Sequence, residues 1–235
     1  MQNGTRINAR PGPATTSAGP GPGLHSLGLD PVRDALLYVP ARYRPTRPAP
    51  FVLSLHGAGG DAQAGLYPLQ ALADSTDLVL LSVASRGATW DAIGGAPGPD
   101  IARIDRALGL AFARITVDVG CLATAGFSDG ASYALSVGLA NGDLFGHVMA
   151  FSPGFIPPAP TRGRPRVFIS HGVRDTVLPI DYCSRRIVPM LRRAKYEVTY
   201  REFDGPHTVP DTIVEAAAAW FVGDERGSIQ SSGNV

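Results

Sequence analysis

The chain is poor in cysteine, in histidine and in charged residues, and each shortage argues against a class of function. Two cysteines and five histidines occur among 235 residues, and they lack the spacing of zinc ligands. Charged residues make up 17% of the chain and the net charge is +1, whereas binding a nucleic-acid backbone needs a basic face. No apolar run approaches the ~20 residues of a membrane span. We therefore expect no metal site, no nucleic-acid partner and no membrane span.

The two ends of the chain are also poor in apolar residues. Residues 1–26 are rich in Gly, Pro, Ser and Thr, and we expect them to form a disordered arm. This arm lacks the apolar middle of a signal peptide, so we expect a cytoplasmic protein or a secreted one whose leader is absent from this chain. Residues 223–235 predict a disordered tail. One folded domain over 27–222 remains, long enough to bury a substantial core.

Within this domain, short apolar runs alternate with amphipathic ones. The strand-like runs cover 35–40, 51–57, 77–83, 121–127, 146–152, 166–172 and 196–203. The helix-like runs cover 62–75, 100–115, 130–142, 180–195 and 209–222. Strands rich in Val, Ile and Leu that alternate with helices predict an α/β fold, with a mostly parallel central sheet and helices on both faces. Ligands of such sheets bind beyond the carboxyl ends of the strands.

One strand end carries the only G-x-S-x-G of the chain, "GFSDG" at 126–130. It follows an apolar run and opens a helix, which is the setting where this motif holds its serine on a strained, exposed turn. The amides at the start of the helix would favour a developing negative charge. A plain tight turn is the alternative, but the strand–turn–helix setting favours Ser128 as a nucleophile.

A nucleophilic serine needs a base, and the chain order that accompanies this motif is nucleophile, acid, histidine. Three histidines fit this order poorly: His25, His56 and His147. His171 ends a strand, but no strand-end acid lies between it and Ser128. His207 follows the last strand in a Gly-Pro-His-Thr loop suited to present a side chain. We therefore favour His207 as the base over a simple surface-loop histidine.

Four aspartates compete for the role of the acid. Asp175 lies in "HGVRDTVLP", just beyond a strand, where it can approach the histidine from a neighbouring strand end. Asp181 is expected to cap the next helix and Asp211 to lie in the first turn of the last helix. Asp204 is the second choice because it is close to His207 in sequence. We favour Asp175.

The strand-like run 51–57 ends in "HGAGG" at 56–60. We expect the imidazole of His56 to pack against this loop and to hydrogen-bond it, rather than to act as a second base. The loop can instead supply a backbone N–H group. The amides of Ala58 and Asp129 are the expected pair of donors to an oxyanion.

Together, "LHGAGG", "GFSDG", "HGVRDTVLP" and "DGPH" resemble the phospholipase/carboxylesterase branch of the α/β-hydrolases. They resemble the polyhydroxybutyrate-depolymerase-like esterases more loosely. The likeness spans roughly 32–222, and it implies an α/β-hydrolase fold and a serine esterase without a cofactor that acts on a small-molecule ester. It also implies that Ser128, Asp175 and His207 form the triad. The stretch "SRGATWD" (85–91) resembles the loop in which a Trp lines the substrate cleft, which makes Trp90 a candidate substrate-binding residue.

The sequence departs from this branch in two places. Asp129 follows the nucleophile where Gln or Ala is common, so we expect its carboxylate to point away from the oxyanion. Residues 152–166 are only a Pro-rich loop, which leaves no room for a cap domain. An open cleft walled by the Gly59 loop, the Trp90 loop and 155–160 favours short- to medium-chain esters.

Other activities suit the same residues. A peptidase or amidase could use the same triad, and a more open cleft would suit a polyester-oligomer or feruloyl-type esterase. A hydrolase-fold binding protein without catalytic activity is the alternative of another class.

Overall fold

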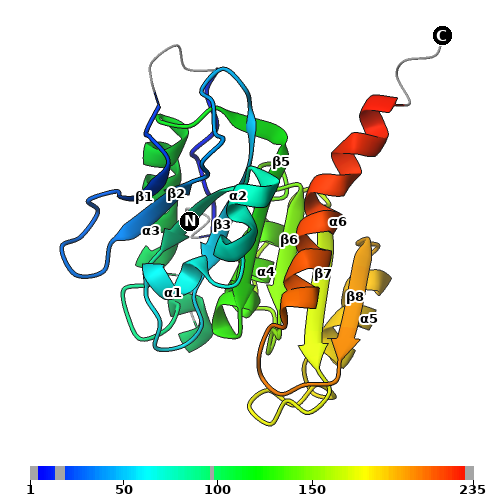
Figure 1. Ribbon diagram of the computed structural model, residues 1–235. Coiled ribbons are helices and arrows are strands. Elements are labelled where there is room, and N and C mark those ends of the chain that lie inside the picture. The colour runs from blue at the N-terminus through cyan, green and yellow to red at the C-terminus, as the bar shows by residue number, and fades with distance from the viewer. Residues whose placement is uncertain (1–4, 14–18, 96–97, 231–235) are drawn as a thin grey trace.

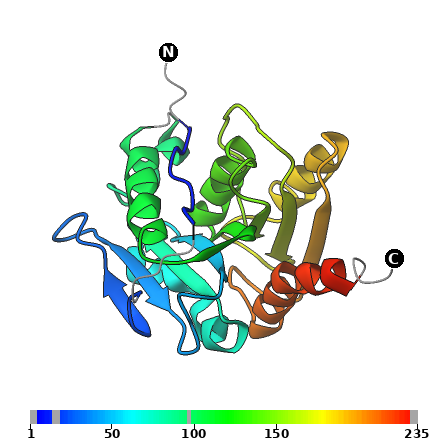
Figure 2. The same cartoon turned by 90° about the horizontal axis from the view of Figure 1, so that it is seen from above.

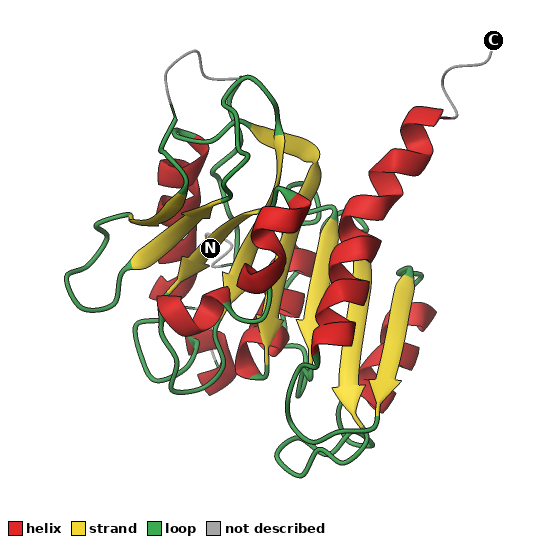
Figure 3. Cartoon of the chain, in the orientation of Figure 1, coloured by secondary structure: helices red, strands yellow, loops and turns green. Residues whose placement is uncertain are grey.

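The computed structural model describes residues 5–13, 19–95 and 98–230, with side chains up to Gly223 (Figure 1). Its strands form one sheet of order β1-β2-β4-β3-β5-β6-β7-β8. They are β1 (Gly23–Ser26), β2 (Ala35–Val39), β3 (Ala49–Leu55), β4 (Val79–Val83), β5 (Val117–Phe127), β6 (His147–Phe151), β7 (Arg166–Gly172) and β8 (Val198–Phe203). The β1–β2 and β2–β4 pairs are antiparallel, and the pairs from β4 to β8 are parallel. The parallel strands therefore end at one edge (Figure 3).

Helices cover both faces of the sheet, as the alternation of apolar runs predicts. They are α1 (Ala62–Leu66), α2 (Gln70–Thr76), α3 (Pro99–Phe112), α4 (Asp129–Ala140), α5 (Ser184–Arg193) and α6 (Asp211–Gln230), with a 3₁₀ turn η1 (Asp91–Gly94). Seen from above, α3, α4 and α5 lie on one face, and α1, α2 and α6 lie on the other (Figure 2). The prediction of a mostly parallel α/β sheet is confirmed.

The segment 62–75, predicted as one helix, forms the two short helices α1 and α2. Tyr67, which precedes Pro68, has extended backbone angles of φ −69° and ψ 140°. Proline has no N–H to donate, and it disfavours helical angles in the residue before it. The amphipathic pattern continues across this break, which explains why the sequence reads as a single helix.

The described part of the arm at 1–26 differs from the expected disordered segment. The Ile7 side chain is fully buried, and its backbone N–H donates to Asn141 Oδ1 at 2.9 Å. Asp105 on α3 accepts the amides of Asn8 and Ala9 at 2.8 and 2.7 Å. Asn141, which follows α4, and Asp105 on α3 therefore accept the backbone N–H groups of this segment. These hydrogen bonds hold the segment against the two helices.

Strand β1 is the second departure, because its four residues pair with β2 inside the stretch expected to be disordered. At the other end of the chain, α6 continues past Val222 to Gln230. The expected tail at 223–235 is therefore helical in its first part, and 231–235 lies outside the described residues.

Candidate active site

Ser128 stands at the turn between β5 and α4 with φ 59° and ψ −123°, a backbone conformation that non-glycine residues rarely adopt. The two glycines of the motif permit this turn. A Cβ on Gly126 would lie 2.3 Å from the carbonyl oxygen of Gly130, and a Cβ on Gly130 would lie 2.1 Å from that of Leu55. Both distances are shorter than atoms allow, so the glycines are needed for β3, β5 and α4 to meet behind the serine.

The structure brings Ser128, His207 and Asp175 together. His207 lies in the loop between β8 and α6, and its Nε2 is 2.9 Å from Ser128 Oγ. Its Nδ1 is 2.5 Å from Asp175 Oδ2, just beyond β7. A carboxylate only accepts hydrogen bonds, so Nδ1 carries the proton and Nε2 is free to accept the serine hydroxyl. The imidazole is thus oriented as a base toward Ser128.

Asp175 is held as a carboxylate. Its side chain is completely buried, and its Oδ1 accepts the amides of Val177 and Leu178 at 2.9 and 2.8 Å. Burial alone would raise its pKa, but the Leu178 amide, His207 and the Val177 amide together hold the pKa below its usual value. The charged form is therefore the stable one beside His207.

The other candidate acids lie elsewhere. Asp204 is exposed and pairs with Arg174, and Asp211 is the first residue of α6. Asp181 pairs with Arg185 at 2.8 Å and does not cap α5, whose N-cap residue is Cys183. Among these aspartates, Asp175 alone contacts His207 in the described structure.

His56 packs within its own loop, as the sequence interpretation holds. Its side chain is buried, Nδ1 lies 2.7 Å from the Gly57 carbonyl oxygen, and Nε2 accepts the Ser85 amide at 2.9 Å. Burial lowers its pKa, so the neutral imidazole is favoured. With both nitrogens engaged, His56 has no nitrogen left to act on a substrate.

The expectation that Trp90 lines a cleft is wrong. The indole is 1% exposed, stacks on Tyr133 with ring centroids 4.9 Å apart, and donates Nε1–H to the His56 carbonyl at 2.9 Å. The indole therefore supports the 56–60 loop from the interior of the protein. The sequence shows an aromatic residue in a loop, but it does not show to which side the ring turns.

Two other aromatic rings, which the sequence motifs do not mark as site residues, lie beside the site instead. The Phe127 ring packs on the His207 imidazole at a centroid distance of 4.7 Å. Tyr67 is 49% exposed and meets Phe127 edge-on at 6.4 Å. Phe127 adjoins Ser128 inside the motif, so its position in the motif was a signal available in the sequence.

The 56–60 loop passes directly beside the serine, because a Cβ on Gly57 would lie 3.4 Å from Ser128 Cβ. In this loop, the Gly59 amide donates to the Ala88 carbonyl at 2.6 Å. Within the described part of the chain, the amides of Ala58 and Asp129 have no hydrogen-bond acceptor. The Asp129 carboxylate accepts the Thr89 hydroxyl at 2.6 Å. Its amide can therefore face an oxyanion while its charge is held by a different partner.

The Pro-rich loop between β6 and β7 forms no helix and no cap over Ser128. Its first part is tied to α4, since Gly154 N–H donates to Ser132 Oγ at 2.9 Å, and Phe155 is 44% exposed nearby. Residues 156–159 and Thr161 line an apolar cavity of about 350 Å³ between α4 and α5. Most of the stretch 155–160 thus faces this cavity, and the start of the loop lies against α4.

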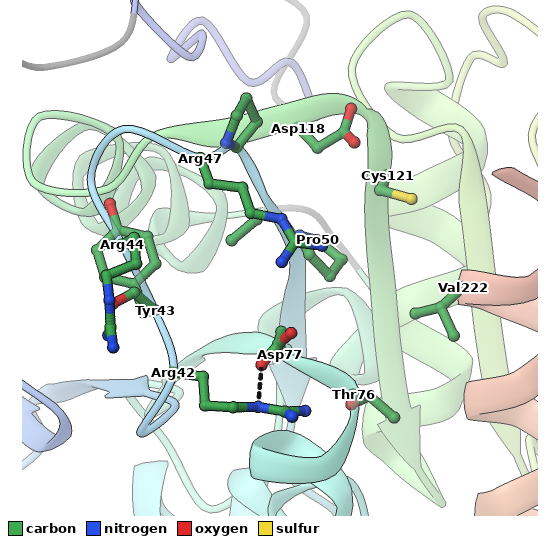
Figure 4. Close-up of a pocket in the computed structure, with 12 residues that line it drawn as sticks. Arg42, Tyr43, Arg44, Arg47, Pro50, Thr76, Asp77, Asp118, Cys121 and Val222 are labelled. Atoms are coloured by element: carbon green, nitrogen blue, oxygen red, sulfur yellow. Dashed lines mark hydrogen bonds and ion pairs between the residues drawn. The ribbon is translucent and has the colours of Figure 1, made fainter. Parts of the chain in front are cut away.

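A second cavity of about 350 Å³ opens at the amino ends of β3 and β5, with Arg42 and Asp77 paired at 3.1 Å (Figure 4). This cavity lies at the opposite edge of the sheet from Ser128.

Among the described residues no group of three His, Cys, Asp or Glu side chains could hold a metal ion, and no helix is long and apolar enough to cross a membrane.

A mostly parallel sheet whose serine sits on a strained strand–helix turn, hydrogen-bonded to a late histidine and an aspartate, defines the α/β-hydrolase fold. No family model matches the chain. It is 27% identical over 168 residues to a probable feruloyl esterase C of Aspergillus oryzae, across 68% of this chain and 60% of that protein. It is also 27% identical to feruloyl esterase C of Emericella nidulans over 158 residues, across 63% of this chain and 57% of that protein. The chain thus spans less than two thirds of the length of these relatives.

Solved structures share the fold. A CE1 ferulic acid esterase from Anaeromyces mucronatus aligns over 92% of this chain and 94% of its own, with a TM-score of 0.62 and 18% identity. S-formylglutathione hydrolase from Staphylococcus aureus aligns over 88% of this chain and 100% of its own, with a TM-score of 0.68 and 15% identity. The comparisons and the geometry agree that the chain has the α/β-hydrolase fold, as the sequence motifs predict.

Proposed function

We propose that the protein is a serine carboxylic ester hydrolase whose nucleophile is Ser128. The observation that carries this proposal is the series of hydrogen bonds from Asp175 through His207 to the serine on its strained turn. The similarity to feruloyl esterases, though these relatives are longer than this chain, supports the same reaction class.

In the proposed reaction, the Ser128 hydroxyl attacks the ester carbonyl while His207 Nε2 takes its proton. Asp175 keeps the imidazole in the required tautomer and stabilises the imidazolium. His207 then gives its proton to the leaving alcohol, and an acyl-enzyme remains on Ser128. Water activated by His207 attacks this intermediate and releases the acid. The side chains in place supply every proton transfer in this cycle.

The tetrahedral intermediates carry a negative oxygen that needs donors. We assign this role to the amides of Ala58 and Asp129, because both lie beside Ser128 and lack acceptors within the described residues. The α4 amino terminus adds a favourable partial charge at the same point. Gly59 belongs to the same exposed loop and borders the space for the substrate.

For the substrate, we propose short- to medium-chain esters. An acyl chain gains ~0.8 kcal/mol per buried CH₂ only while protein walls remain to bury it. Neither 350 Å³ cavity includes Ser128, and the Pro-rich loop forms no cap. The gain should therefore stop after a few carbons.

A feruloyl-type ester is the second candidate, because aromatic rings lie where an aryl acyl group would pack. Phe127 packs on His207, and Tyr67 meets Phe127 edge-on with about half of its surface in solvent. An aromatic acyl group would find face and edge contacts there that a straight chain does not use.

The test is a matched panel measured with one enzyme preparation: p-nitrophenyl esters from two to twelve carbons, methyl ferulate, a matched p-nitroanilide and a polyester film. We expect the highest kcat/KM on short to medium esters and a slow anilide reaction. A higher kcat/KM on methyl ferulate than on every alkyl ester would favour the feruloyl-type activity. Monomer release from the film would favour the polyester-oligomer activity. A protein that hydrolyses none of the panel and takes up no fluorophosphonate would be a binding protein instead.

A further inference from the structure

His171 is a second histidine in contact with the acid of the triad. It lies at the end of β7 with its side chain fully buried, and its Nε2 is 3.2 Å from Asp175 Oδ2. The same Nε2 is 2.8 Å from the Leu178 carbonyl oxygen, and Nδ1 is 2.7 Å from Ser184 Oγ at the start of α5. The catalytic cycle proposed above uses neither His171 nor Ser184.

These contacts assign the tautomer of His171. Both atoms that face Nε2 are acceptors, the Asp175 carboxylate and the Leu178 carbonyl, so Nε2 must carry a proton. Burial is the largest influence on this imidazole and lowers its pKa, which favours the neutral ring. A neutral ring with a proton on Nε2 leaves Nδ1 as an acceptor. The Ser184 hydroxyl therefore donates to Nδ1 and stabilises this tautomer.

We propose that His171, with its tautomer held by Ser184, is a positioning residue that fixes Asp175 against His207. This inference rests on the proposed function. One carboxylate oxygen, Oδ2, is shared between His207 Nδ1 at 2.5 Å and His171 Nε2 at 3.2 Å. The other, Oδ1, accepts the Val177 and Leu178 amides. His171 also binds the Leu178 carbonyl, so one imidazole holds both the acid and the turn that carries its amide donors.

Sharing Oδ2 has a consequence for the base. A donor to Asp175 draws negative charge away from the bond to His207 and so limits how far the carboxylate stabilises the imidazolium. Without that donor, the carboxylate keeps more of its negative charge for the bond to His207. The acid limb of the pH–rate profile should then move upward.

Other titratable groups surround this pair. Glu202 on β8 lies opposite His171 in the strand register, and it is held by Arg185 of α5 at 2.7 Å. The Cys183 thiol before α5 has its pKa raised by burial and then by Asp175, so it stays neutral. Arg174 pairs with Asp204 on the exposed side of the loop. None of these residues is itself substituted in the His171 and Ser184 variants, and Glu202 and Arg174 are each engaged in an ion pair of their own.

The test compares three variants with one control. His171→Leu removes the donor, His171→Gln restores an N–H where Nε2 stood, and Ser184→Ala frees the tautomer. His147→Leu is the control, because His147 is another buried histidine but lies at the amino end of β6. Each protein is measured for thermal unfolding, for kcat/KM against pH on a p-nitrophenyl ester and for the rate of fluorophosphonate labelling. The downfield N–H proton resonance of His207 Nδ1 gives a further reading that needs no turnover.

We expect His171→Leu to lower kcat/KM by about 10- to 100-fold, the equivalent of one hydrogen bond to a charged group. Its acid limb should move to higher pH and the His207 resonance should broaden. His171→Gln should recover most of the rate, Ser184→Ala should change it a few-fold in the same direction, and the control should match the wild type. Should His171→Leu fail to fold, His171→Gln still has to keep most of the rate, and Ser184→Ala still has to show its smaller loss with the shifted limb.

A folded His171→Leu with the wild-type profile, labelling rate and resonance would overturn the proposal. The proposal would also be overturned by a uniform loss of rate that leaves the acid limb of the pH–rate profile in place and that His171→Gln does not rescue. The failure of the proposed function is a different result: the wild type would hydrolyse no ester. In that event the labelling rate and the resonance still decide whether His171 positions Asp175.

Discussion

The two ends of the parallel sheet differ in how tightly their polar groups are held. At the carboxyl end, Ser128 and His207 belong to a continuous series of hydrogen bonds, and its members are buried or half-buried. At the amino end, a cavity of about 350 Å³ is lined by Arg42, Arg44 and Arg47, which are exposed (Figure 4). The amino end thus has a hollow without a series of this kind, whereas the carboxyl end has the oriented groups. We therefore place the proposed chemistry at the end with the fixed geometry and not at the hollow.

The largest difference should appear between two serines at that carboxyl end. Ser128 and Ser152 follow neighbouring strands, and both have positive φ, 59° and 53°. Ser152 is fully buried, and its Oγ has no partner within the described residues. We expect Ser128→Ala to lower kcat by about 10⁴ or more, because Ser128, unlike Ser152, is hydrogen-bonded to His207 as its base. Ser152→Ala should stay within a few-fold. Steady-state rates with unfolding curves check both, and a comparable loss in the two variants would contradict the account.

The second comparison is between two aspartates near His207. Asp175→Asn should lower kcat by about 10³–10⁴, because an amide in place of the carboxylate favours the wrong histidine tautomer. Asp204 is exposed and bound to Arg174, so Asp204→Asn should have a mild effect. The measurement is the turnover of both variants under the same conditions. If the two effects were reversed, the acid would be misassigned.

The motifs made the site predictable because each is local. The glycines at 126 and 130 fit against backbone atoms, so their spacing around Ser128 encodes the turn directly. Asp175 and His207 follow adjacent parallel strands, and parallel strands end at one edge of the sheet. The chain order of the motifs and their positions at strand ends therefore predict that Ser128, Asp175 and His207 are neighbours, although many residues separate them in the sequence.

The features that were not predicted depend on contacts between distant segments. Trp90 turns inward because Tyr133 and the His56 carbonyl receive it, and neither partner is visible from the loop sequence. Ile7 lies in a polar arm, and the Asn141 side chain that accepts its backbone amide is far away in the sequence. The sequence shows His171 four residues before Asp175, but it does not show that the two side chains turn toward each other.

The third prediction concerns stability and compares glycines in two helices. A Cβ on Gly130 would meet the Leu55 and His56 carbonyl oxygens at 2.1 and 2.5 Å, whereas a Cβ on Gly109 in α3 meets nothing within 4 Å. Gly130→Ala should lower the free energy of unfolding by about 3 kcal/mol or more, since backbone must move. Gly109→Ala should raise it by up to about 1 kcal/mol through helix propensity. Urea unfolding curves measure both; a Gly130→Ala protein as stable as the wild type would show that the turn has room.

The fourth prediction places a pH effect at the amino end. Burial, followed by Arg166, lowers the pKa of His147 from 6.5 to about 4. The unfolded chain therefore binds a proton here at higher pH than the folded chain does. This stability is complete above pH 6.5 and is lost as pH falls toward 4, on the order of 2–3 kcal/mol. His147→Leu should show a smaller loss between these pH values than the wild type. Equal pH dependence in the two proteins would contradict a buried neutral His147.

The account rests most directly on the reactivity of Ser128. The measurement is labelling with a fluorophosphonate followed by peptide mass spectrometry, in the wild type and in His207→Ala. We predict one adduct per chain on Ser128, and slowing by about 10³-fold or more when the base is removed, since the serine is then no longer activated. An unlabelled wild type, an adduct on another residue, or equal labelling without His207 would contradict the claim that this turn holds an activated nucleophile.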